Sequence, residues 1–270
     1  MKLIPRAPLL WMTAILVGLC LSPAARAGTP PDQQFAEAKD AFEKGDFRKA
    51  LSLGETIIQN ENVVSPTLFQ FLGNTRYRQG DLGRATLWYR RAALFPPPAP
   101  ETRQNLAHVH DRTGNLAFPS NTFSDQIGAY LTRSQWLAIA VFCGWSFVFL
   151  LLVAFLMLRA GELRVFFVTV ATLALVCGVV SATCWFNRPS YEKIRDLAVV
   201  TSPQASAYTA ASITSGSVSS LPPGSEVRRL NDRGAWSYVE IPSSNGTPLR
   251  GWVQNEMLSP FWPFKPEYLE

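Results

Sequence analysis

The sequence predicts a multi-domain membrane protein: an all-α repeat domain, a transmembrane α-hairpin and a small all-β barrel, in that order. Two long runs without a charged residue, 136–158 and 165–186, predict the hairpin. Glycines that recur at positions 45, 80 and 114 predict turns between paired helices before it. Short stretches that alternate apolar and polar residues, separated by Pro- and Gly-rich turns, predict strands after it.

Residues 1–27 have the composition of a secretory signal peptide. Lys2 and Arg6 precede an apolar run, and "ARA" before Gly28 fits the small-x-small cleavage rule. An uncleaved anchor is the alternative, although the apolar run is short for a full span. The formal net charge of the 270-residue chain is +5. Because this leader carries Lys2, Arg6 and Arg26 without an acid, most of that surplus leaves with it. The remainder has no concentrated basic face, which argues against a nucleic-acid partner.

The two uncharged runs are each long enough to cross a bilayer core of about 30 Å as a helix. Only residues 159–164 separate them, so the spans form a tight antiparallel hairpin. With the leader cleaved, residues 159–164 lie in the cytoplasm, and Arg159 and Arg164 agree with the positive-inside tendency. Both flanking domains then lie on the exported side of the membrane. The spans contain no ionisable Asp, Glu, Lys, Arg or His, which favours an anchor over a transport path.

The segment before the spans repeats itself with a period of 34 or 35 residues, measured between Gly45, Gly80 and Gly114. This period and its Gly-Asp turns resemble the tetratricopeptide repeat. The second unit carries the match at these positions: Phe69, Leu72, Gly73, Tyr77, Gly80, Ala85, Tyr89, Ala92 and Pro97. We therefore assign residues 31–118 to a repeat domain of about two repeats and a capping helix.

In that family the first helices line a concave face that binds a partner. The candidate groove residues here are Gln70, Asn74, Tyr77, Arg78, Gln104 and His108. A short structural spacer without a binding groove is the alternative. His108 and His110 point to different sides of one helix, so they cannot chelate a metal ion together.

Residues 197–260 resemble the bacterial SH3-like domain, a small all-β barrel. The resemblance rests on a Val-rich opening strand, a Pro-Gly turn before "EVRRL", the strand "WSYVEI" and then "GWV". Such domains bind cell-wall peptides or protein segments, and the candidate contact residues are Trp236, Tyr238 and Trp252. Packing in the core or rim is the commoner use of such rings in a small barrel. The aromatic end of the chain, "PFWPFKPEYLE", is expected against the barrel or the membrane interface.

The chain contains none of the sequence motifs GxSxG, HExxH, GxxxxGK[ST] and GxGxxG, and no Cys or His spacing typical of zinc. Cys143, Cys177 and Cys184 all lie in the apolar runs, so the exported regions have no cysteine for a disulfide. We therefore expect a non-enzymatic protein without a cofactor or metal.

The order of leader, tetratricopeptide units, membrane hairpin and SH3-like domain resembles the BatE-type proteins of the bacterial aerotolerance cluster. That resemblance implies a scaffold in an envelope stress or protein-maturation complex. It also implies protein partners, namely von Willebrand A domain membrane proteins and a MoxR-type ATPase. A cell-wall anchor that binds peptidoglycan through the SH3-like domain is the alternative.

Overall fold

The computed structural model describes residues 32–61, 64–119, 127–156, 161–243 and 246–269. The predicted signal peptide and Arg159 lie outside these ranges. The described chain forms two compact units: one is built from residues 127–188, and the other combines 32–119 with 189–269. The segments before and after the apolar helices therefore belong to the same unit.

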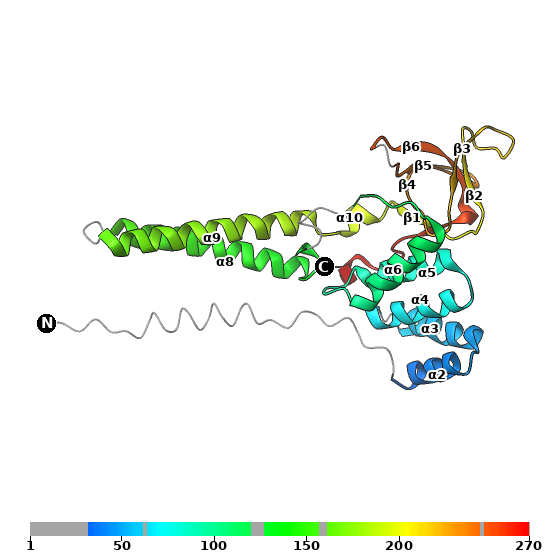
Figure 1. The fold of residues 1–270 in the computed structure, drawn as a ribbon, viewed down its shortest axis with the longest axis horizontal. Coiled ribbons are helices and arrows are strands. Elements are labelled where there is room, and N and C mark those ends of the chain that lie inside the picture. The colour runs from blue at the N-terminus through cyan, green and yellow to red at the C-terminus, as the bar shows by residue number, and fades with distance from the viewer. Residues whose placement is uncertain (1–31, 62–63, 120–126, 157–160, 244–245, 270) are drawn as a thin grey trace. The chain divides into compact units, whose positions relative to one another are not determined.

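Between residues 32 and 119 the structure has the helices α2 (Asp32–Glu43), α3 (Phe47–Glu61), α4 (Pro66–Arg78), α5 (Leu82–Ala93) and α6 (Pro100–Thr113). They stack in sequence order (Figure 1). Gly45 and Gly80 form the turns within the first two helix pairs with φ of 78° and 81°, and Gly114 ends α6 with φ of 62°. Each of the three recurring glycines thus occupies a backbone conformation that glycine adopts without steric cost. We call α2–α6 the helical segment.

The α4–α5 pair is closed by close approach of its two helices. A Cβ atom at Gly73 would lie 2.6 Å from the Tyr89 ring, so only glycine leaves room for that ring. Phe69, Leu72 and Tyr89 are buried, as the repeat pattern predicts. Asp81 caps α5 by accepting a hydrogen bond from the Arg84 backbone N–H at 3.1 Å.

Helices α8 (Arg133–Leu156) and α9 (Gly161–Asn187) are long and apolar enough to cross a membrane. They lie side by side (Figure 1). Their contact uses small residues, since Gly178 faces Cys143 and Ala171 is fully buried. The prediction that residues 159–164 form a loop is wrong for Gly161–Arg164, which belong to α9. Glu162 in the first turn is favourable at a helix N-terminus, which extends the helix beyond the apolar run.

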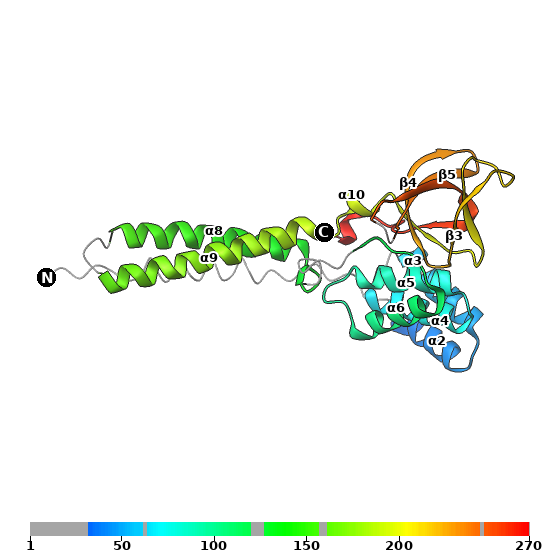
Figure 2. The same cartoon turned by 45° about the horizontal axis from the view of Figure 1, so that its top comes forward.

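After the short helix α10 (Tyr191–Ile194), the chain forms one antiparallel sheet of seven strands. The strands are β1 (Leu197–Val200), β2 (Ala205–Tyr208), β3 (Ser217–Leu221), β4 (Glu226–Arg233), β5 (Trp236–Ile241), β6 (Leu249–Gln254) and β7 (Leu258–Pro260). Their order across the sheet is β3-β2-β6-β5-β4-β1-β7. Two short 3-10 helices, η1 (Asn255–Met257) and η2 (Pro266–Leu269), flank β7. Figure 2 shows how strongly the sheet curls. We call β1–β7 the sheet segment.

The core of the sheet segment is aliphatic. Its buried members are Ala198, Val200, Ala205, Ala207, Leu221, Val227, Val239, Ile241 and Val253. They come from alternate positions of the strands, which is the pattern of a sheet with one face buried. None of the three predicted binding aromatics belongs to this core.

Candidate functional site

Two of the predicted groove residues, Tyr77 on α4 and His108 on α6, contact each other directly. The Tyr77 hydroxyl lies 2.8 Å from His108 Nε2 and accepts a hydrogen bond from Arg112 Nη1 at 2.8 Å. The Arg112 guanidinium also lies 5.5 Å from the centre of the Tyr77 ring. Tyr77 and His108 therefore join two helices, and the Tyr77 hydroxyl and His108 Nε2 are already engaged within the chain.

A second set of bonds lies beside the first. Asn74 Oδ1 accepts hydrogen bonds from the Tyr89 hydroxyl at 2.8 Å and from Asn105 Nδ2 at 3.1 Å. Burial, and then the neighbouring Tyr77, raise the pKa of Tyr89 well above its usual range, so it stays a neutral donor. Asn74 thus fixes α4 against α5 and α6.

The other three groove candidates, Gln70, Arg78 and Gln104, have fewer contacts within the chain. Arg78 is exposed and lies over the Phe42 and Phe47 rings at 6.0 Å and 5.6 Å from their centres. Gln70 and Gln104 have no hydrogen-bond partner among the described residues. Of the six candidates, these three make no side-chain hydrogen bond among the described residues.

The sheet segment brings its three predicted aromatics together on its outer face. Trp252 lies directly opposite both Tyr208 on β2 and Tyr238 on β5. The Tyr238 and Trp252 ring centres are 5.2 Å apart, and those of Tyr208 and Trp236 are 5.8 Å apart with the rings nearly perpendicular. All four rings are half-buried. We call these four residues the aromatic face.

The sequence interpretation missed Tyr208, although a signal for it was present. The stretch "ASAY" alternates small buried residues with outward ones, and Tyr208 takes an outward position beside Trp252. The β2–β3 hairpin, which lies at one edge of the sheet, places Tyr208 beside β6. The hydroxyl groups of Tyr208 and Tyr238 and the indole N–H groups of Trp236 and Trp252 donate no hydrogen bond within the described chain.

Charged residues continue this outer surface. Glu240 lies between two arginines, with Arg228 Nη1 at 3.0 Å from Oε1 and Arg250 Nη2 at 3.4 Å from Oε2. Arg228 also lies 4.8 Å from the centre of the Phe118 ring. The aromatic face therefore offers two hydroxyl and two indole N–H groups as hydrogen-bond donors. The neighbouring Arg228, Glu240 and Arg250 together carry a net charge of +1. This combination suits a ligand with flat apolar surfaces and hydrogen-bond acceptors.

The helical and sheet segments are joined by buried polar contacts. Glu226 on β4 is 5% exposed and forms an ion pair with Arg90 on α5 at 2.5 Å. The Glu226 carboxylate also accepts a hydrogen bond from the Phe118 backbone N–H at 3.0 Å, and its own N–H donates to the Leu116 carbonyl at 2.8 Å. Asn115 Nδ2 donates to the Gly224 carbonyl at 2.9 Å. The chain that follows α6 is thus tied to the start of β4.

Arg91 ties the end of the chain to the same helix. Its Nε donates to the Phe261 carbonyl at 2.8 Å and its Nη2 to the Pro260 carbonyl at 2.9 Å. The guanidinium lies 4.5 Å from the centre of the Trp88 ring and 5.3 Å from that of Phe264. Burial lowers the pKa of Arg91 to about 9, so the side chain keeps its charge at neutral pH.

The aromatic tail after β7 packs against the helical segment and also against β1, where the Phe261 N–H donates to the Leu197 carbonyl at 3.0 Å and Val199 shares its core. The expected contact with the strands is therefore present, and the contact with the helical segment is an addition to it. Phe264 stacks on Phe69 with ring centres 5.4 Å apart, and Trp262 lies edge-on to Phe69 at 6.1 Å. Phe261 and Trp262 are each 4% exposed and belong to the same core as Phe69 and Trp88. The basic stretch around Arg90 and Arg91 holds two segments together instead of facing solvent.

Two glycines allow the close approach of the segments. A Cβ atom at Gly83 would lie 2.8 Å from the Thr201 carbonyl oxygen, and one at Gly224 would lie 2.6 Å from Thr86 Oγ1. Gly224 also has φ of 89°. The helical and sheet segments thus approach closely, through backbone at Gly83 and through the Thr86 and Asn115 side chains at Gly224.

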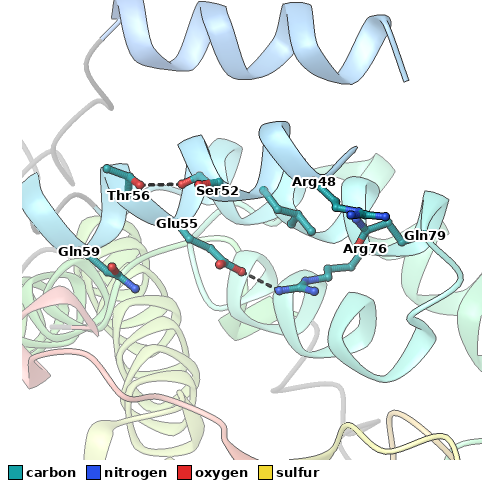
Figure 3. A pocket seen from close by; sticks show the side chains of 8 residues that line it. Arg48, Ser52, Glu55, Thr56, Gln59, Arg76 and Gln79 are labelled. Atoms are coloured by element: carbon teal, nitrogen blue, oxygen red, sulfur yellow. Dashed lines mark hydrogen bonds and ion pairs between the residues drawn. The ribbon is translucent and has the colours of Figure 1, made fainter. Parts of the chain in front are cut away.

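The helical segment has a polar depression of about 450 Å³ between α3 and the end of α4 (Figure 3). Glu55 and Arg76 form an ion pair across it at 2.7 Å. Arg76 also lies 3.8 Å from Asp81, so its charge is balanced. Because most of the remaining side chains are exposed, we do not regard this depression as the main candidate site.

No protein-family model matches the chain, and no curated protein matches it. Among the described residues, no three His, Cys, Asp or Glu side chains are grouped closely enough to hold a metal ion. The candidate functional site is therefore defined by geometry alone: the aromatic face, carried on a unit whose two segments are held together.

Proposed function

We propose that the protein is a non-enzymatic, membrane-anchored scaffold that binds protein partners through its exported parts. The observation that carries this proposal is the aromatic face. Its four neighbouring rings lie outside the aliphatic core, and their hydroxyl and indole N–H groups make no hydrogen bond among the described residues. Aromatic residues of this kind are enriched where proteins bind one another. The coupling through Arg90 and Arg91 supports a scaffold that presents this surface at a fixed orientation.

The proposed setting follows from the sequence resemblance. The helical segment would be a tetratricopeptide domain, the sheet segment an SH3-like domain, and α8–α9 a hairpin in a bacterial inner membrane. Both domains would then lie on the periplasmic side, in an envelope stress or maturation complex with von Willebrand A domain membrane proteins and a MoxR-type ATPase. Reporter fusions after Gly28 and at Glu270 test the topology, because a cytoplasmic signal at both ends contradicts it.

Site-specific photo-crosslinking in native membranes tests the scaffold proposal. We expect p-benzoylphenylalanine in place of Tyr238 to capture a protein partner that mass spectrometry can identify. The same substitution at Ile213, which is 64% exposed on the β2–β3 connection, is the matched control and should capture less. Equal capture at both positions, or none at position 238, would contradict the role of the aromatic face.

The aromatic face also favours a second function, a cell-wall anchor. Sugar rings can stack on exposed tryptophan and tyrosine rings while hydroxyl and indole N–H groups donate hydrogen bonds. If this function is correct, the full chain in detergent micelles sediments with isolated wall material and the Trp252→Ala variant does not. A scaffold without wall affinity stays in the supernatant in both forms.

A further inference from the structure

A cleft of about 590 Å³ lies where the turn between α4 and α5 meets the sheet segment. Leu82, Pro203 and Pro223 form its apolar walls, and Gln79, Gly80 and Glu256 line it as well. Its volume falls in the range of ordinary ligand pockets. We propose that this cleft binds a lysine side chain, with its flanking backbone, from a partner protein. This inference rests on the proposed scaffold function, because it assigns the chemistry of one partner segment.

The charges around the cleft leave one carboxylate unpaired. The Asp81 carboxylate already has partners, since it caps α5 and forms an ion pair with Arg84 at 3.0 Å. Glu256 on η1 has no hydrogen-bond or ion-pair partner among the described residues. With Asp81 and Arg84 cancelling, the cleft carries a net charge of about −1, which attracts a cation.

The walls suit the rest of a lysine side chain. A lysine buries its aliphatic stem against apolar surface and keeps its ammonium group at a polar edge. The two prolines and Leu82 supply that surface, and Glu256 supplies the acceptor. Glu256 is exposed at this edge. A strongly hydrated ammonium group can therefore pair with it and stay in contact with water, whereas the more weakly hydrated guanidinium of arginine is better suited to buried ion pairs.

The cleft is formed before any ligand binds, because its two sides already contact each other, both within its lining and beyond it. Gly83 touches the backbone of Thr201, and Arg90 and Arg91 hold the sheet segment and the tail to α5. Sites between two packed segments are common binding positions, and a rigid site loses less entropy on binding. The ligand therefore meets a surface that neither segment offers alone.

The test is a titration of the full chain in detergent micelles, with leucine methyl groups labelled with carbon-13. The probe is N-acetyl-lysine methylamide, and the comparison probe is N-acetyl-norleucine methylamide, which has a similar stem without the charge. We expect the lysine probe to shift the Leu82 methyl signals in a saturable way. The norleucine probe should bind at least threefold more weakly at low salt, and added salt should reduce the difference.

Glu256→Gln is the decisive variant, because it removes the charge and keeps the shape. We expect it to weaken the lysine probe about three- to tenfold and to leave the norleucine probe unchanged. Glu267→Gln, an exposed carboxylate on η2 that does not line the cleft, is the matched control and should have no effect. Absence of a Leu82 shift, or equal affinity of both probes, overturns the inference. So does full affinity of the lysine probe for the Glu256→Gln variant.

The two proposals fail separately. If the lysine probe behaves as expected while Tyr238 captures no partner, the cleft chemistry stands and the scaffold function through the aromatic face falls. If Tyr238 captures a partner equally well in the wild type and in Glu256→Gln, and the lysine probe does not bind, the scaffold stands and the cleft inference falls.

Discussion

Replacing Arg91 by methionine tests whether the tail is held to the helical segment by two hydrogen bonds. The substitution keeps most of the apolar stem and removes both donors from the Pro260 and Phe261 carbonyl groups. A buried acceptor without a partner costs about 1–3 kcal/mol. Removing the buried guanidinium charge also removes its desolvation penalty, which offsets part of this destabilisation. We therefore expect the free energy of opening the tail to fall by about 2–3 kcal/mol.

Native-state hydrogen exchange of residues 261–269 measures this opening directly. A loss of about 2 kcal/mol corresponds to roughly thirtyfold faster exchange in these amides. Arg91→Lys should have an intermediate effect, because an ammonium group can satisfy the two carbonyls less well than a planar guanidinium. The full chain in detergent micelles is the sample for all variants.

Arg84→Met is the matched control for this prediction. Arg84 lies on the same helix, but its side chain is 51% exposed and its ion pair with Asp81 is at the surface. Such pairs contribute less than about 1 kcal/mol, so tail exchange should stay within about threefold of the wild type. If Arg91→Met changes tail exchange no more than Arg84→Met does, the hydrogen bonds of Arg91 do not hold the tail.

Three further predictions follow from local geometry. Gly224→Ala should lower the free energy of unfolding by about 2–4 kcal/mol in urea titrations, because the position has positive φ and the new Cβ would clash with Thr86. Gly234→Ala is the control: its φ is also positive, but a Cβ there meets nothing within 4 Å, so the free energy of unfolding should fall by only about 1 kcal/mol. Hydrogen bonds from Arg229 and then Ser237 hold the pKa of the Asp232 carboxyl below its usual value. The ionised carboxylate therefore stabilises the fold above the ordinary carboxyl pKa, and this stabilisation is lost as pH falls through the lowered pKa. Asp232→Asn should make the melting temperature less dependent on pH between about pH 2 and 5. Gly178→Leu should destabilise the α8–α9 hairpin by about 1–3 kcal/mol in detergent-unfolding assays, and Gly144→Leu, whose Cβ meets nothing within 4 Å, should not.

Several elements were predictable because their signals are local. The positions of Gly45, Gly80 and Gly114 predicted three backbone turns, and all three have positive φ. The uncharged runs predicted α8 and α9 because length and composition suffice for a membrane-spanning helix. The start of α9 was mispredicted because a polar first turn carries no hydrophobic signal.

The candidate site was only partly predictable. Strand alternation brought Trp236, Tyr238 and Trp252 to one side of the sheet, but their position outside the core depended on the small buried residues beneath them. The hydrogen bonds of Tyr77 to His108 and Arg112 were not predictable, because they depend on side-chain geometry across two helices.

The sequence by itself determined the order of segments, the helix turns and the apolar helices, since each depends on residues within a few turns or strands of one another. Only the tertiary structure decided that the helical and sheet segments form one unit. The contacts responsible join residues far apart in the chain, such as Arg91 with Phe261 and Arg90 with Glu226. No local pattern distinguishes an arginine that faces water from one that binds a carbonyl 170 residues away, because the difference lies in what packs over it.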